Sequence, residues 1–282
     1  MKLMTDRRTA LVALPFLLCT FFIGCGRGGI PPLISTPPVT TGTGNWSITG
    51  YYEDTPNTFA PYYIEGSLIN TNGQITGVFH IGTNCFGFSA TDIPYTGTLD
   101  SKNNLRITSS SVNGQILTVQ GLISSDGSTL SRANFAVTGG CSRSIVGITR
   151  SDGPGAEETT TGVRIPSLSG TWTTDISTTG PVTVINSELL TQSSAPDVHG
   201  DYALTGTVTA QGSSCFSRGT LQSGSFVSGN AGRERILMED GSTLNATLQV
   251  NYGSASQAKP TLYLPGTITG GNCNGPIQID LQ

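Results

Sequence analysis

Cysteine is the residue type with the clearest potential for chemistry in this chain of 282 residues. None of the six cysteines forms a Cys-x-x-Cys pair, so their spacing gives little support to a zinc or redox site. Two lie near the N-terminus, and the other four are widely spaced. These four are Cys85, Cys141, Cys215 and Cys273. An even number of distant cysteines is typical of disulfides in an oxidising compartment.

The two histidines, His80 and His199, and the acidic residues are the other candidates for catalysis. The histidines lack the spacing of a metal-binding pair, and no Gly-x-Ser-x-Gly elbow supplies a nucleophilic serine. We interpret both as ordinary strand or surface residues. Paired carboxylates serve glycoside hydrolysis, but adjacent acids on a strand point to opposite faces. The sequence therefore predicts no enzyme, no metal site and no cofactor.

Residues 51–66, YYEDTPNTFAPYYIEG, are the best candidate for a ligand surface. They include five aromatic residues: Tyr51, Tyr52, Phe59, Tyr62 and Tyr63. Aromatic side chains on a loop between strands can bind a sugar or a peptide. The alternative is that they cap the end of a barrel and pack on Pro56 and Pro61.

The chain contains two copies of one pattern of markers, in the same order and at similar spacing. The matches are GNWSITG (44–50) with GTWTTDI (170–176), ITGVFHIGTNCF (75–86) with LTGTVTAQGSSCF (204–216), NLRITSSS (104–111) loosely with RERILMED (233–240), and VTGGC (137–141) with ITGGNC (268–273). DGSTL also occurs twice, at 126–130 and 240–244, but at different distances from the flanking cysteines. It reflects either convergent turn chemistry or an insertion in one copy.

The duplication selects one pairing of the four distant cysteines. If each unit folds by itself, Cys85 pairs with Cys141 and Cys215 pairs with Cys273. Each disulfide would close a loop of more than 50 residues and stabilise its unit by about 2–4 kcal/mol.

Period-two alternation and frequent Asn-Gly and Asp-Gly turns predict an all-β protein. We expect two homologous antiparallel β-meander domains in tandem, at 44–150 and 168–282, each a barrel or alternatively a sandwich. The polar, glycine-rich segment 151–167 is predicted to be the linker. A transmembrane β-barrel is disfavoured, because aromatic residues are only 7% of the chain and Ser/Thr turns are many.

Each predicted unit opens with Gly-x-Trp, and this motif resembles the start of lipocalin- and avidin-type barrels. The resemblance covers three residues per unit and implies a closed barrel with a ligand cavity. Trp46 and Trp172 would then plug one barrel end. The alternative is that both tryptophans are structural anchors of the core.

The N-terminus has the organisation of a secretory signal. Lys2, Arg7 and Arg8 precede an apolar run over 9–23, which is shorter than the ~20 residues that a spanning helix needs. The following FIGC, ending at Cys25, resembles a bacterial lipobox. That resemblance implies that residues 1–24 are a signal peptide, that Cys25 is lipidated, and that 25–43 form a Pro/Gly-rich tether.

Composition limits the partners of the mature chain. Without residues 1–24 it carries 11 basic and 17 acidic residues, so nucleic-acid binding is excluded and the membrane is reached through covalent lipid. By the lipobox resemblance, the absence of Asp after Cys25 favours the outer membrane. We expect a non-enzymatic, lipid-anchored envelope protein that binds a small ligand or a protein or glycan partner. The alternatives are a structural envelope component and, third, a hydrolase.

Overall fold

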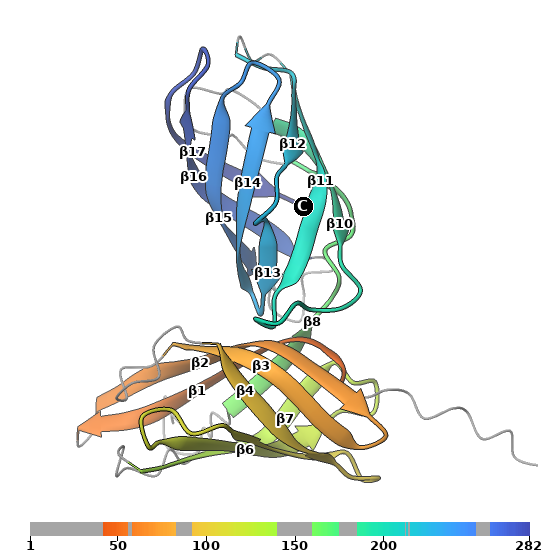
Figure 1. Ribbon diagram of the computed structural model, residues 1–282, viewed down its shortest axis with the longest axis vertical. Helices are drawn as coiled ribbons and strands as arrows, with labels where there is room; N and C mark the ends of the chain where they lie inside the picture. The colour runs from red at the N-terminus through yellow and green to blue at the C-terminus, as the bar shows by residue number, and fades with distance from the viewer. Residues whose placement is uncertain are drawn as a thin grey trace, which may run out of the picture. The chain divides into compact units, whose positions relative to one another are not determined.

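The computed structural model is built of β-strands (Figure 1). It describes residues 42–55, 58–82, 92–139, 160–174, 185–211, 213, 215–251 and 260–282. Across these ranges there is no helix with the length and apolarity to cross a membrane. The first eight strands close into an antiparallel barrel, and the rest form a nine-stranded antiparallel sheet. The all-β class and the β-meander order predicted from the sequence are confirmed.

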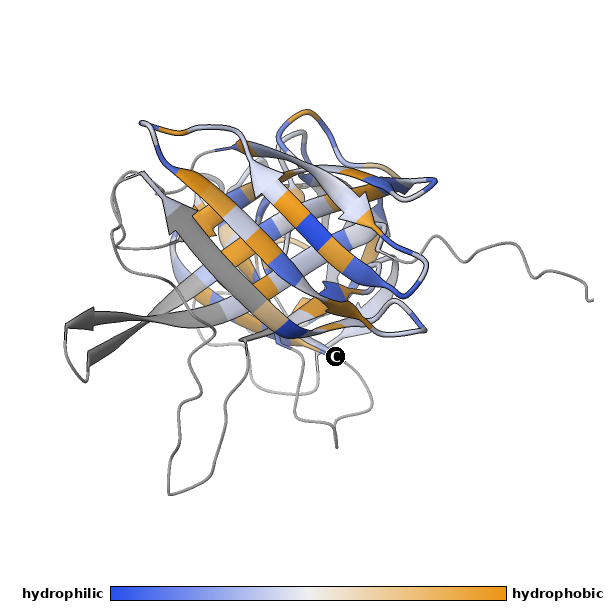
Figure 2. Ribbon diagram, turned by 90° about the horizontal axis from the view of Figure 1, so that it is seen from below, coloured by the Kyte–Doolittle hydropathy of each residue, from blue (hydrophilic) through white to orange (hydrophobic). Residues whose placement is uncertain are grey.

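The first barrel is a simple meander in which each strand pairs with the next and β8 pairs back with β1. Its strands are β1 (Gly44–Thr55), β2 (Thr58–Thr71), β3 (Gln74–Gly82), β4 (Ile93–Leu99), β5 (Asn104–Ser109), β6 (Ile116–Ile123), β7 (Thr129–Thr138) and β8 (Thr160–Ile165). Buried and exposed residues alternate along β4 and β5. Figure 2 shows the same alternation of hydrophobic and hydrophilic residues along the strands.

Strand β8 corrects the predicted linker at 151–167. Residues Thr160–Ile165 pair with β1, from Asn45↔Ile165 to Thr49↔Thr161, and close the barrel. The sequence TTGVRI is short and follows a polar stretch, so its alternation does not stand out. Its pairing is determined by the two free edges of β1 and β7, which need a common neighbour.

The second sheet has eight strand positions in the same meander order. Its strands are β9 (Gly170–Thr173), β10 (Ile185–Gln192), β11 (Tyr202–Ala210), β12 (Arg218–Leu221), β13 (Phe226–Ser228), β14 (Ala231–Met238), β15 (Thr243–Asn251), β16 (Thr261–Thr269) and β17 (Gly275–Leu281). Both β12 and β13 pair with β11 and β14, so together they occupy one position. The edges β9 and β17 meet through the bridge Thr174↔Leu281 and reciprocal Thr173–Gln282 backbone bonds of 2.9 and 2.8 Å.

The strand positions agree with the repeats found in the sequence. The matched segments fall on β3 and β11, on β5 and β14, and at the ends of β7 and β16. DGSTL, in contrast, turns the β6–β7 hairpin in one unit and the β14–β15 hairpin in the other, which are different positions. In both turns Asp accepts hydrogen bonds from a serine two residues later, and the intervening Gly127 and Gly241 have φ of 71° and 83°. The motif is therefore convergent turn chemistry.

The two predicted tryptophan anchors have the same geometry in both units. Trp46 and Trp172 are buried on the first strand of each unit. Their indole N–H groups donate to the carbonyl oxygens of Gly42 and Leu168, at 3.0 and 2.8 Å, four residues earlier in both cases. The glycine two residues before each tryptophan has a φ near +147°, a conformation that favours glycine.

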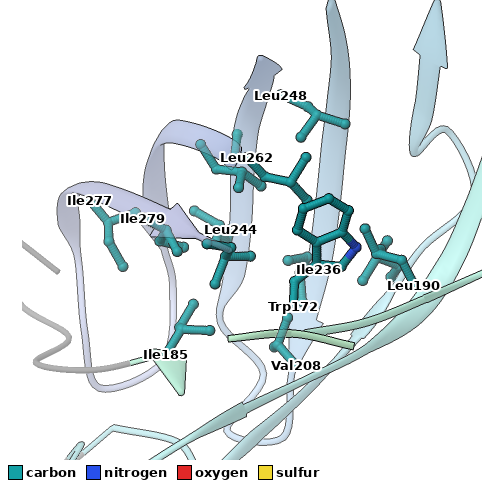
Figure 3. Close-up of a cluster of buried hydrophobic side chains, with 14 of the residues drawn as sticks. Trp172, Ile185, Leu190, Val208, Ile236, Leu244, Leu248, Leu262, Ile277 and Ile279 are labelled. Carbon is teal, nitrogen blue, oxygen red and sulfur yellow. The ribbon is translucent and has the colours of Figure 1, made fainter. Parts of the chain in front are cut away.

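Apolar side chains fill both interiors over the described residues. Trp46, Phe79 and Tyr95 have 0–1% exposed surface, and Phe79 and Tyr95 stack edge to face at 4.9 Å. In the second sheet, Trp172 lies among side chains from several strands, including Leu190 and Ile236 (Figure 3). An eight-stranded barrel is just wide enough for side chains to fill it. Side chains this enclosed border no water-sized space.

Candidate functional site

One of the two predicted disulfides lies within the described residues. Cys215, just before β12, and Cys273, in the turn between β16 and β17, are bonded with Cα atoms 5.7 Å apart. This is the pair that the duplication predicts for the second unit. Cys85, Cys141 and the predicted lipidation site Cys25 lie outside the described residues.

The aromatic residues of the first unit lie on paired strands and not on the loop that the sequence predicts. The β1–β2 pairing continues to Thr55↔Thr58, although β8 accompanies β1 only to Thr49 and β3 accompanies β2 only from Tyr63. Among the described residues, Gly50–Thr55 and Thr58–Tyr62 therefore pair only with each other. We call this two-stranded extension the arm. Tyrosine and phenylalanine favour extended backbone, which explains strands in place of a loop.

The arm includes four of the five predicted aromatic residues, Tyr51, Tyr52, Phe59 and Tyr62. The fifth, Tyr63, stands at its base with 43% of its surface exposed. The arm also includes Glu53 and Asp54 and no basic residue, and its outer backbone edges have no neighbouring strand among the described residues. Over the described residues, the arm therefore combines aromatic residues with strand edges that lack a neighbour, and an extended peptide can add to such an edge.

The structure brings together the two histidines, which the sequence analysis treated as unrelated. His80 on β3 donates from Nε2 to Asp201 at 2.9 Å, and its Nδ1 lies 3.2 Å from Asp92. His199 Nδ1 bonds the other oxygen of Asp92. We call His80, Asp92, His199 and Asp201 the His–Asp cluster. His80 and Asp92 belong to the first barrel, and the other two belong to the loop before β11.

That loop is a tight turn organised by one aspartate. Asp197 Oδ1 accepts from the backbone N–H of His199 at 2.8 Å and of Asp201 at 3.0 Å. Its own N–H donates to Asp201 O at 2.8 Å, and Gly200 N–H donates to Asp197 O at 3.1 Å. The sequence PDVHGD thus holds His199 and Asp201 in place. Aspartate readily accepts a hydrogen bond from the backbone N–H two residues later, and Gly200 adopts the positive φ of +85° that the turn requires.

The environment of the cluster raises the pKa of both histidines. The hydrogen bond to Asp201 is the main cause for His80, and the charges of Asp201, Asp92 and Glu65 add to it against the opposing effect of burial. The bond to Asp92 is the main cause for His199. Nearby, burial raises the pKa of Glu65 to about 7, against the lowering effect of a bond from the Asn230 backbone.

A second titratable pair lies inside the second sheet. Glu188 on β10 and Glu234 on β14 are both buried, with 1% and 0% exposed surface. Oε1 of Glu188 and both carboxyl oxygens of Glu234 accept no hydrogen bond from any other described residue, and the two carboxyl groups interact with each other. Burial raises the pKa of Glu188 to about 7, and burial together with the charge of Glu188 raises that of Glu234 well above its ordinary value.

Sequence reasoning missed both groups for a common reason. It compared acids and histidines that are close in the chain, whereas His80 and Asp201 are 121 residues apart and Glu188 and Glu234 come from different strands. Alternation does contain a signal for Glu234, which occupies an inward position on β14. No comparable signal identifies Asp92 or Asp201.

Among the described residues, no nucleophile is hydrogen-bonded to either group, and no set of three His, Cys, Asp or Glu side chains is placed to hold a metal ion. No protein-family model, curated protein or solved structure matches the chain. The arm and the His–Asp cluster are therefore the two candidate functional sites on the described surface.

Proposed function

We propose that this protein is a lipid-anchored component of a bacterial cell envelope, most consistent with the outer membrane, which binds a protein or glycan partner through the arm. The observation that carries the proposal is the continuation of β1 and β2 beyond the barrel, with four aromatic residues on the continuation. Over the described residues the arm has no third strand, and a two-stranded ribbon is only marginally stable in water. A partner that covers it would supply the missing contacts.

Several features support this location and mode of binding. The lipobox-like FIGC and the Pro/Gly-rich segment after it suit an anchor and a tether, and the Cys215–Cys273 disulfide suits an oxidising compartment. Buried apolar side chains line the interior of both units over the described residues, which favours binding at the outer surface. No catalytic role is assigned, because no nucleophile is hydrogen-bonded to either titratable group over the described residues.

The alternative is a structural envelope component without a discrete ligand. The buried apolar cores of both units are as compatible with a structural component as with a protein that binds a partner at its surface. The two functions differ in what they require of the arm: a structural component tolerates its loss, whereas a binding protein does not.

Site-specific photo-crosslinking in cells separates them. A photoreactive amino acid at Tyr63, at the base of the arm, should give a discrete adduct with an envelope component. That adduct should disappear when Tyr51 and Tyr52 are both changed to Ala. The matched control is the same photoreactive group at Leu237 of the second sheet, which is 44% exposed and should give no such adduct. Equal products from both positions, or an adduct that survives the double substitution, would support the structural reading.

A further inference from the structure

The first barrel and the second sheet contact each other at two points where only glycine fits. A Cβ added to Gly229 would lie 2.3 Å from Cβ of Glu65, and one added to Gly200 would lie 2.5 Å from the carbonyl oxygen of Val78. At the first point, the Asn45 side chain donates to Gly229 O at 2.9 Å and accepts from Gly229 N–H at 2.5 Å. The contact is therefore close and directional.

The His–Asp cluster lies at the second of these points, beside Gly200. It joins the units through His80–Asp201 and His199–Asp92, so each bond crosses from one unit to the other. Four acids face the two histidines: Asp92 and Glu65 from the first barrel, and Asp197 and Asp201 from the second sheet. No lysine or arginine is among the groups whose charge shifts either histidine.

We propose that the His–Asp cluster is a pH-dependent latch, which holds the first barrel against the second sheet while both histidines are charged and releases it when they lose their protons. With two imidazolium groups, each inter-unit bond joins opposite charges. With neutral imidazoles, the carboxylates face one another without counter-charge, and their repulsion favours separation. Histidine is the residue suited to such a change near neutral pH.

The direction of the pH dependence follows from the raised pKa values. The contact between the units raises the pKa of His80 and His199 above the ordinary histidine pKa of 6.5. Each histidine therefore stabilises the closed arrangement fully at a pH below 6.5. This stabilisation is lost as the pH rises through the raised pKa. Glu65 acts in the same direction, because its buried carboxyl loses its proton near pH 7. Opening therefore releases protons, and the latch weakens as the pH rises above 6.5.

Metal binding accounts less well for the same four side chains. Histidine and carboxylate are zinc ligands, but a zinc site needs its donors to converge on one point. Here both ring nitrogens of His80 already lie beside carboxylates, Nε2 beside Asp201 and Nδ1 beside Asp92. The potential ligands therefore contact one another in pairs and do not surround a common point.

The test is a pH titration of the chain produced without residues 1–24, from about pH 5.5 to about pH 8.5. The sequence has only two histidines, so their ring protons are assignable by single substitutions. Both should titrate above 6.5, and the radius of gyration from small-angle X-ray scattering should rise over the same range. Asp92→Asn should move both histidine midpoints toward 6.5, and His80→Gln should give the larger radius even at the acidic end.

Asp280→Asn is the matched control, because it removes one carboxylate from β17 outside the cluster and should leave the pH profile unchanged. Tryptophan fluorescence from Trp46 and Trp172, one in each core, reports whether every variant remains folded. The latch is contradicted if the radius of gyration of the unmodified chain is constant over this range, or if His80→Gln keeps its full pH dependence.

Discussion

At the scale of single residues, the buried carboxyl pair is the least expected feature of the molecule. Glu188 and Glu234 occupy inward strand positions that are otherwise apolar, and burial of an ionised carboxylate without a donor is unfavourable. Each therefore holds its proton at a pH where glutamate is ordinarily ionised. The second unit should be most stable in acid, unlike a domain held by surface ion pairs.

The sign of this effect is testable by thermal unfolding followed by circular dichroism. Because the pKa of Glu188 is raised to about 7, its contribution to stability is complete below 4.5 and is lost as the pH rises through 7. The melting temperature should fall as the pH rises from about 5 to about 8.5. The corresponding loss of unfolding free energy should be at most on the order of 3 kcal/mol.

Glu234→Gln removes one of the two buried charges and should flatten that decline. Glu239→Gln, at the exposed end of the same hairpin, is the control and should retain it. If Glu234→Gln melts with the same pH dependence as the unmodified protein, the pair does not govern the stability of the unit.

At the scale of elements, the sequence was sufficient for strands that alternate clearly and for turns with Asp-Gly or Asn-Gly. It predicted the duplication, the Cys215–Cys273 pair and the equivalent roles of Trp46 and Trp172, because these depend on local pattern or symmetry. It missed β8 and the strand character of the arm. The pairing of β8 depends on which edges remain free after the barrel has formed, and no local pattern records that. The arm did carry a local signal, since its aromatic residues favour extended backbone, but they were interpreted as a loop.

The Cys215–Cys273 disulfide should stabilise the second unit by constraining its unfolded chain. Replacing both cysteines by serine should lower the unfolding free energy by about 2–4 kcal/mol, with the larger loss expected because the closed loop spans 58 residues. Urea titration measures this directly. A reducing agent should lower the stability of the unmodified protein similarly, and an unchanged midpoint in both experiments would show that the bond is dispensable.

At the scale of the whole molecule, the two β units share the same order of strands but carry different surface and buried features. The second carries the buried carboxyl pair, and the first carries the arm, whose aromatic sequence is not repeated in the second unit. The proposed latch uses His80, which lies within the matched segment 75–86 but has no histidine at the equivalent position of 204–216, and three residues outside the matched segments, Asp92, His199 and Asp201. In this account divergence after duplication added function at the surface, whereas the tryptophan-anchored cores stayed alike.

The location of the protein is the claim on which the proposed function depends, because an arm that binds an envelope partner requires an anchored chain. The symmetry of the repeat predicts that the four distant cysteines form two pairs, of which Cys215–Cys273 is present. Because Cys19 lies within the predicted leader, Cys25 is the thiol that we propose for lipidation. Metabolic labelling of cells with a palmitate analogue tests this directly. The account predicts that the protein is labelled in membranes and that Cys25→Ala abolishes the labelling, and labelling of Cys25→Ala at the level of the unmodified protein would contradict it.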